Sequence, residues 1–335
     1  MKALSNKQRL YILMPILLGC MLVLAYYSMN IGHIPITPDR ILQTLMGNGT
    51  EDENLVLFIL RLPKTAVAII VGICLAVSGA VMQGVTRNPL ATPSMLGVSS
   101  GASLGTLIVI YLYDKGFGMV MPEPLAAVAG GMLAFVTVYS LALKYSLSPV
   151  KLILNGIAIN SCIGAISLVL SMKLSSDAYT LRTVIMGGSL GYATWPMILM
   201  AVCMTVPLLM YVIYKAIHLN ILNLGDEMAV GLGINLIKER KKLLYVTVIL
   251  TSVSAYIAGG ISFIGMIAPH IAKRIVGSNY KYFMPLAIMI GIDIVLLSDV
   301  LSRLLASSGT DVPIGTLISI IGAPYLLYLL FAEDR

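Results

Sequence analysis

Apolar runs of about 20 residues recur along this chain, and they constrain its fold more than any other feature of the sequence. A run of that length crosses the hydrocarbon core of a bilayer as one α-helix. Lipid offers no hydrogen-bond partners, so each crossing segment has to satisfy its own backbone groups, and the alternating pattern of barrel strands is absent. The chain is therefore predicted to be an all-α polytopic membrane protein with about ten transmembrane helices.

The composition agrees with a membrane environment. Hydrophobic residues make up 58% of the 335 residues and charged residues only 11%, whereas a soluble domain carries about a quarter charged residues. The first apolar run is expected to be a retained helix, because it is too long for a signal peptide and lacks a small-residue cleavage site. The expected spans are about 10–29, 62–83, 94–113, 123–143, 152–172, 194–214, 243–259, 261–276, 282–302 and 313–331.

Lysine and arginine predict the orientation of the chain, since cytoplasmic loops of membrane proteins carry an excess of both. With the N-terminus inside, 15 of the 22 lysines and arginines fall in inner segments and the other 7 in outer segments. Both termini are therefore expected to be cytoplasmic. Topology then accounts for the net charge of +7, and no nucleic-acid partner is expected.

No set of residues suited to covalent chemistry is apparent. The sequence contains no nucleophile–base pair, phosphate-binding loop or metalloprotease motif, so no catalytic residue, metal or cofactor is expected, and a membrane-embedded enzyme is disfavoured. The cysteines lie in apolar runs without metal-ligand spacing and are expected to be small buried hydrophobes. The cysteines are Cys20, Cys74, Cys162 and Cys203, and the scattered histidines are His33, His218 and His270.

Two segments between the spans are long. The outer segment 30–61 carries an acidic cluster at residues 51–53, and the inner segment is 215–242. In the inner segment, Asp226 is expected to cap a short helix with an apolar body, and Glu227 in the first turn suits the helix dipole. The residues alone leave two interpretations open: a helix lying on the lipid headgroups, or a docking element for a cytoplasmic partner.

The sequence RNPLATPSMLGVSSG (87–101) interrupts two apolar runs with residues that break helices. Proline cannot continue a helix, glycine allows close backbone packing, and serine can bond the backbone groups that a broken helix leaves free. The segment is predicted to be a structured elbow, with a simple tight turn as the alternative. The elbow residues are Pro89, Pro93, Gly97 and Gly101.

Several of these segments resemble permeases of the FecCD type, which are subunits of ATP-binding-cassette (ABC) importers. The segments are RLPKTAVAIIVGICLAVSGAVMQGVTRNPLATPSMLGVSSGASLG (61–105), LNLGDEMAVGLGI (222–234), GGISFIGMIAPHIAKRIVGSNYKYFMPLAIMIGIDIVLLSDVLSRLL (259–305) and DVPIGTLISIIGAPYLLYLL (311–330). The chain departs from the family pattern at Thr92, where an acidic residue is usual, and at Gly260, where proline is common. The resemblance covers most of the chain from residue 61 onward.

The resemblance implies a permease subunit similar to the membrane subunit of the vitamin B12 importer. Such a subunit moves an iron–siderophore or a similar metal chelate, haem or cobalamin inward along the interface of a permease dimer. It implies one transmembrane permease domain (1–335) with a first helix (10–29), a four-helix half (about 62–172), a sixth helix (194–214), a cytoplasmic coupling segment (215–242) and an inverted four-helix half (about 243–331). Inverted halves are common in transporters.

The resemblance also implies partners and a location. The partners are cytoplasmic ABC ATPase subunits, a second permease subunit of the same or a related chain, an extracytoplasmic substrate-binding protein and membrane lipid. The location is a bacterial cytoplasmic (inner) membrane. The permease itself is not expected to be an enzyme, because the ATPase subunits hydrolyse the ATP.

Family positions assign roles to particular residues. The ATPase-coupling residues are Leu224, Gly225, Asp226, Glu227, Ala229 and Gly231. The residues that dock the binding protein are Arg61, Lys64 and Arg303, with interfacial snorkelling as the alternative. The candidates for the pathway and gate are Ser148, Pro149, Val150, Asn155, Asn160 and Ser319, with hydrogen bonding between helices as the alternative.

Two aspartates inside the spans need an explanation, because charge is costly in a bilayer. Asp293 and Asp299 are six residues apart and do not share a helix face, whereas Asp299 can pair with Arg303 at i,i+4. The alternative function is an ion-coupled secondary transporter that uses both aspartates. The segment 215–242 discriminates the two functions, because a secondary transporter has no need for an ATPase-docking helix.

Overall fold

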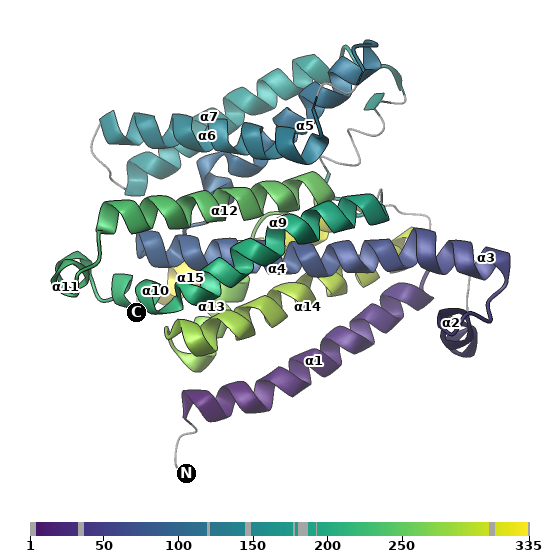
Figure 1. The fold of residues 1–335 in the computed structure, drawn as a ribbon, viewed down its shortest axis with the longest axis horizontal. Helices are drawn as coiled ribbons and strands as arrows, with labels where there is room; N and C mark the ends of the chain where they lie inside the picture. Colours follow the sequence, from purple (N-terminus) through teal and green to yellow (C-terminus); the bar gives the residue numbers. More distant parts are fainter. Residues whose placement is uncertain are drawn as a thin grey trace.

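Long apolar helices lie side by side along one axis in the computed structural model (Figure 1). The structure describes residues 5–32, 37–118, 121–144, 149–176, 178–179, 187–191, 193–307 and 312–333. Within these ranges every regular element is helical. The segments long and apolar enough to cross a membrane are Asn6–Asn30, Glu51–Thr86, Glu123–Leu141, Leu154–Ser171, Trp195–Tyr214, Leu236–Ala258 and Tyr280–Ala306, with shorter apolar helices at Val98–Asp114 and Ile314–Leu329.

A helix occupies each expected span. These helices are α1 (Asn6–Asn30), α4 (Leu62–Thr86), α5 (Val98–Asp114), α6 (Glu123–Lys144), α7 (Pro149–Ser171), α9 (Trp195–Tyr214), α12 (Leu236–Ala258), α13 (Ile264–Val276), α14 (Tyr280–Ser307) and α15 (Ile314–Glu333). The shorter elements are α2 (Pro38–Leu45), α3 (Glu51–Asn54), the π-helix η1 (Leu55–Arg61), the 3₁₀ turn η2 (Pro93–Leu96), α10 (Ala216–Leu222) and α11 (Asp226–Gly231).

Helix α4 is the centre of the bundle. It is buried along most of its length and packs against α9, α12, α13 and α14, while α5, α6 and α7 form a layer beyond α12 (Figure 1). Glycine permits the close approach of these backbones. A Cβ atom built on Gly79 would lie only 1.8 Å from the carbonyl oxygen of Gly265 in α13. Small residues therefore set the helix spacing around α4.

The second span begins earlier than its apolar run predicts. The segment 30–61 was expected to lie outside the span, but helix runs without a break from Glu51 through η1 into α4. Thr50 starts it, because the Thr50 side chain accepts from the Glu53 backbone N–H and the Glu53 side chain accepts from the Thr50 N–H. The acidic cluster is therefore the first turn of a helix that extends past the bundle.

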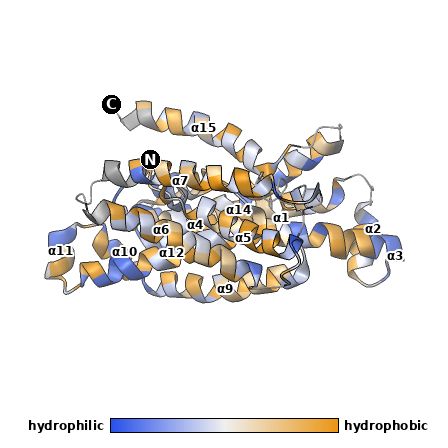
Figure 2. Cartoon of the chain, turned by 90° about the horizontal axis from the view of Figure 1, so that it is seen from above, coloured by the Kyte–Doolittle hydropathy of each residue, from blue (hydrophilic) through white to orange (hydrophobic). Residues whose placement is uncertain are grey.

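The bundle has two chemically distinct ends. Helix α1 begins, α15 ends, and α10 and α11 lie at one end, which we call the α11 end, whereas α2 and α3 lie at the other, the α3 end (Figure 1). Hydrophilic colouring gathers near α10, α11 and α3, and apolar colouring follows the long helices (Figure 2). At the α11 end, the Arg9 Nη1 donates to the carbonyl oxygen of Ile275 at 3.0 Å and ties α1 to α13.

Candidate functional site

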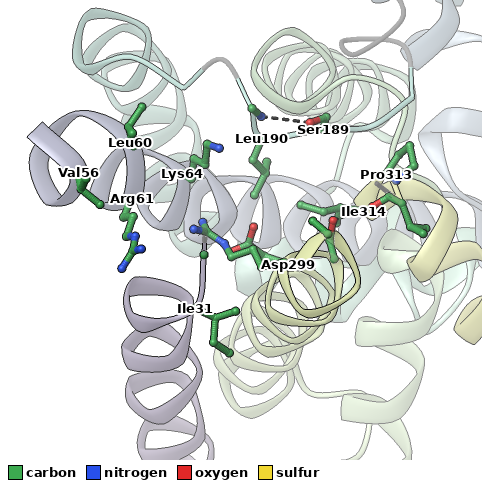
Figure 3. A pocket seen from close by; sticks show the side chains of 16 residues that line it. Ile31, Val56, Leu60, Arg61, Lys64, Ser189, Leu190, Asp299, Pro313 and Ile314 are labelled. Atoms are coloured by element: carbon green, nitrogen blue, oxygen red, sulfur yellow. Dashed lines mark hydrogen bonds and ion pairs between the residues drawn. The ribbon is translucent and has the colours of Figure 1, made fainter. Parts of the chain in front are cut away.

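A cavity of about 500 Å³ opens at the α3 end (Figure 3). Three basic side chains and one carboxylate line it, so the cavity carries net positive charge. The charged residues are Arg61, Lys64, Asp299 and Arg303, and the wall also includes Ile31, Val56, Leu60, Ser189, Leu190, Pro313 and Ile314. The structure therefore brings together the three residues expected to dock the binding protein.

Asp299 is the centre of a buried polar network, the Asp299 cluster, made of Ser28, Thr65, Asp299 and Arg303. The Asp299 Oδ2 accepts from the Ser28 hydroxyl at 2.7 Å and from the Arg303 Nε at 2.9 Å. The hydroxyls of Ser28 and Thr65 are 3.0 Å apart. This confirms the i,i+4 pairing of Asp299 with Arg303, and it joins α1, α4 and α14 at the α3 end.

Arg61, although it lines the cavity, makes its hydrogen bonds with the end of α1. Its guanidinium donates to the carbonyl oxygens of Met29 and Asn30, the latter at 3.2 Å, and the residue is only 4% exposed. These carbonyls belong to the last turn of α1, where a helix leaves acceptors unsatisfied. Figure 3 shows Arg61 pointing away from Lys64. In this conformation the Arg61 guanidinium holds α1 against α4 and is not presented to a docking partner.

Lys64 and Arg303 remain available at the cavity. Lys64 is half-buried, whereas the Arg303 side chain is only 14% exposed and its Nη2 is buried without a hydrogen-bond partner among the described residues. Because the Arg303 Nε donates a hydrogen bond to Asp299, substitution of Arg303 would disturb the packing of the helices as well as the charge at the cavity. Lys64 has no such attachment to the fold among the hydrogen bonds and ion pairs recorded for the described ranges.

At the α11 end the expected short helix is present as α11, but its start differs from the prediction. Gly225, with φ +114°, occupies the capping position, and Asp226 is the first helical residue, so Asp226 does not cap the helix. Glycine fits here because only it adopts such a φ without strain. Leu224, Glu227 and Gly231 are exposed.

Ala229 is fully buried, while its neighbours Met228 and Val230 are each 58% exposed. The Ala229 side chain packs inward in the single chain, and the exposed apolar surface of α11 comes from the residues on either side of it.

Asp226 joins three elements in the Asp226 cluster, made of Arg87, Asp226 and Arg240. Arg240 of α12 binds both carboxylate oxygens, with Nη2–Oδ1 at 2.6 Å and Nη1–Oδ2 at 3.2 Å. Arg87, directly after α4, also donates to Oδ1. Sequence reasoning missed this cluster, because 139 residues separate Arg87 from Asp226 and no local pattern relates them.

A second cavity, of about 550 Å³, lies behind the Asp226 cluster. Its lining is apolar and aromatic on α4, α6 and α12, and the rings of Phe135 and Tyr139 stack there with centroids 5.5 Å apart. All three charged residues of the cluster line the cavity. The cluster therefore has open space on one side.

The elbow 87–97 turns through two left-handed residues, Arg87 with φ +52° and Gly97 with φ +79°. Pro93 begins η2, and the hydroxyls of Ser94 and Ser99 lie 3.1 Å apart across the turn. Pro89 precedes η2 in the turn, and Gly101 packs in α5, where an added Cβ would lie 2.5 Å from the carbonyl oxygen of Gly130 in α6.

The pathway candidates take up separate places. The Asn160 Nδ2 donates to the Ser94 carbonyl oxygen at 3.3 Å, so α7 contacts the elbow. The Ser319 hydroxyl donates to the Gly315 carbonyl oxygen at 2.8 Å within α15, and Asn155 is half-buried on α7. Pro149 and Val150 belong to the first turn of α7, and Ser148 lies outside the described residues.

The two intramembrane aspartates differ in their surroundings. Asp299 is paired, whereas both carboxylate oxygens of Asp293 are buried without a hydrogen-bond partner in the described part of the chain. Across that same part, no group of three or more His, Cys, Asp or Glu residues is placed to hold a metal ion. The two aspartates therefore do not form a joint ion site.

Known proteins match the chain over almost its full length. The sequence profile of the FecCD transport family matches residues 20–332. The iron(3+)-hydroxamate import system permease FhuG of Bacillus subtilis is 39% identical over 340 residues, which cover 100% of both chains. The hemin transport system permease HmuU of Yersinia pestis is 34% identical, with 95% of this chain and 94% of HmuU covered.

Structural comparison gives the same result. An inward-facing structure from a metal-chelate-type ABC transporter superposes with a TM-score of 0.78 at 26% identity. The match covers 96% of this chain and 99% of the other. The similarity therefore includes α1 and the α11 end as well as the central helices.

Proposed function

The chain belongs to the FecCD transport family, as a permease subunit of an ABC importer of the iron–siderophore, haem or citrate class, and we propose that it moves an iron chelate inward along the interface of two permease subunits. It is a multi-pass membrane protein and is not itself an ATPase. The observation that carries the proposal is the match over residues 20–332, which includes the coupling segment around α11.

The ten long helices form a first helix, a separate sixth helix (α9) and two four-helix halves of opposite orientation, at about 62–172 and 243–331. The α11 end faces the cytoplasm. Basic residues at that end, including Lys238, Lys241 and Lys242, support this orientation, since positive charge favours the cytoplasmic side. Both termini are then cytoplasmic, in a bacterial inner membrane.

The ATPase subunit docks on α11. Exposed apolar side chains on a six-residue helix, Met228 and Val230, stand beside the exposed Glu227. Interfaces of this kind are built on a few apolar anchors with charges around them. The second permease subunit packs on α7 and α15, whose side chains are largely exposed in the single chain.

The binding protein docks at the α3 end, on Lys64 and Arg303. Two partly buried cations at the mouth of a cavity suit acidic side chains of a partner, which they would steer and orient more than bind tightly. Arg61 is excluded from this surface by its burial and its contacts with α1.

The ion-coupled alternative finds no support. Asp299 is paired with Arg303 and accepts a hydrogen bond from Ser28, and no group of three or more His, Cys, Asp or Glu residues surrounds either aspartate among the described residues. Among the described residues the two aspartates therefore do not act as a free pair of carboxylates.

The cargo is tested by uptake of radiolabelled iron in cells that express the chain with its ATPase and binding protein. Iron is supplied as a ferric hydroxamate, as ferric citrate or as haem, because the names of the relatives span all three. We expect import of one of these forms that stops when the ATPase is omitted. Import that continues without the ATPase would overturn the proposal.

ATPase docking is tested with Val230→Glu. A charge placed on the exposed apolar surface of α11 should reduce co-purification of the ATPase while membrane abundance stays normal, because Val230 is 58% exposed. The matched control is Phe117→Glu, which adds the same charge at an exposed apolar residue of the α3 end. Equal ATPase recovery from both variants would exclude α11 as the docking site.

A further inference from the structure

Helix α11 contacts its neighbours in sequence by packing, but it contacts the end of α4 through an ion pair. Within the described residues it packs against α10 and α12, its neighbours in sequence, and Ala229 is its one buried residue. Its connection to α4 is made by side chains, through Asp226 and Arg87. Asp226 therefore joins α11 to the bundle on two sides, through Arg87 at the end of α4 and through Arg240 on α12, and α12 itself packs against α4.

The backbone of Arg87 is unusual for a residue with a side chain. It ends α4 with φ +52° and ψ +30°, a left-handed conformation that glycine occupies at many helix ends. A residue other than glycine in this region carries strain, and such residues concentrate at functional positions. A glycine here would turn the chain more easily but would leave Asp226 without its contact to α4.

The Arg87 side chain reaches the start of α11 at this point. Gly225, which precedes α11, has open space around the position of a missing Cβ atom, and the nearest atom to that position is the Arg87 Nη1 at 3.8 Å. The cavity of about 550 Å³ lies behind the same side chains. The Arg87–Asp226 ion pair therefore bridges the end of α4 and the start of α11 beside this open space.

We propose that Arg87 is a positioning residue for energy coupling, whose ion pair with Asp226 transmits a displacement of α11 to the end of α4. Helix α4 packs against α9, α12, α13 and α14, so a movement of its end reaches the centre of the bundle. Arg240 holds Asp226 in place from α12 with two hydrogen bonds. This inference rests on the proposed function for the identity of the ATPase, but the link itself belongs to the permease alone.

The first test uses the purified permease in nanodiscs without partners. Arg87→Ala should increase hydrogen exchange of the backbone amides of 226–232 several-fold, because a helix with few remaining contacts opens more often. Arg87→Lys keeps the charge and should recover part of the protection. The matched control is Arg40→Ala, which breaks another arginine–carboxylate pair, with Glu53, at the α3 end. Unchanged exchange at 226–232 in Arg87→Ala would overturn the proposal.

The second test measures ATP hydrolysed per iron chelate imported by the reconstituted importer, with the ferric chelate identified by the uptake experiment. For Arg87→Ala we expect this ratio to rise about fivefold, the size that loss of one exposed ion pair supports, while the ATPase stays bound. Arg87→Lys should lie near the wild type. An unchanged ratio, or loss of ATPase binding, would overturn transmission through Arg87. Failure of the docking site itself would show separately, as normal ATPase recovery with Val230→Glu.

Discussion

An aspartate forms an ion pair with arginine at each end of the bundle, but one ion pair is buried and the other is exposed to solvent. In the Asp299 cluster the side chains of Asp299 and Arg303 are 4% and 14% exposed, and hydroxyls from two other helices complete the network. In the Asp226 cluster the exposed fractions are 43% for Asp226, 39% for Arg87 and 28% for Arg240. Burial makes one arrangement a permanent joint, and exposure makes the other one adjustable.

This difference in exposure fits the proposed function of each end of the bundle. A buried ion pair is costly to break, because separation leaves a charge without water or a partner. An exposed pair breaks cheaply, because water replaces the partner. A joint among α1, α4 and α14 benefits from the first property, whereas a docking helix that has to move in each transport cycle requires the second.

The largest effect is expected from Asp299→Ala. The variant leaves the guanidinium of Arg303 buried without its carboxylate, which should destabilise the protein by about 3–5 kcal/mol. Thermal unfolding in detergent and abundance in the membrane measure the loss.

The double variant Asp299→Ala/Arg303→Met is the control, because it removes the stranded charge and should recover part of the stability. If the single and double variants are equally unstable, the cost does not come from the unpaired charge, and the comparison between the two ends fails.

A smaller loss is expected from Arg61→Ala. The carbonyl oxygens of Met29 and Asn30 lose a buried donor, at a cost of about 1–3 kcal/mol, and hydrogen exchange near the end of α1 should rise. Arg61→Lys keeps the charge with fewer donors and should be intermediate. An effect on binding-protein docking with no change in α1 would instead favour a rim role for Arg61.

The helices could be predicted from the sequence because their signals are local. Whether an apolar run is long enough to cross the membrane depends only on its own 20 or so residues. Likewise, Asp299 and Arg303 lie on one helix at a spacing that brings their side chains together. The early start at Glu51 was missed, although the Thr50–Glu53 capping box lies in the sequence, because the apolar run alone was used to place the boundary.

The sites could be predicted only in part, because their geometry depends on distant segments. Six residues of α11 do not determine which face turns inward, so the burial of Ala229 was not foreseeable. Arg61 was expected at the surface, and its burial depends on where α1 ends, 31 residues earlier. Arg87 and Asp226 meet only because α4 and α11 reach the same end of the bundle.

Lys64→Glu tests whether the charge of Lys64 attracts the binding protein or stabilises the fold. Because Lys64 makes no hydrogen bond within the Asp299 cluster, the variant should cost less stability than Asp299→Ala and should slow binding-protein association by about tenfold at low salt. The difference from the wild type should shrink at high salt, since salt screens exposed charge. Lys64→Gln, which removes the attraction without adding repulsion, should slow association less. Association rates measured against ionic strength decide this.

The smallest effect on stability is expected from Asp226→Ala. It is the sharpest test of the comparison, because Asp226→Ala and Asp299→Ala make the same substitution, aspartate to alanine, at the two ends of the bundle. The arginines of the Asp226 cluster stay partly in water, so the loss should be about 1 kcal/mol or less. It should fall further as salt is raised, whereas the loss from Asp299→Ala should not, because buried pairs are screened much less. A double-mutant cycle with Arg87→Ala isolates the pair. A salt-independent loss of several kcal/mol from Asp226→Ala would mean that the α11 end is also a permanent joint, and α11 would then be fixed to α4 and not displaced against it.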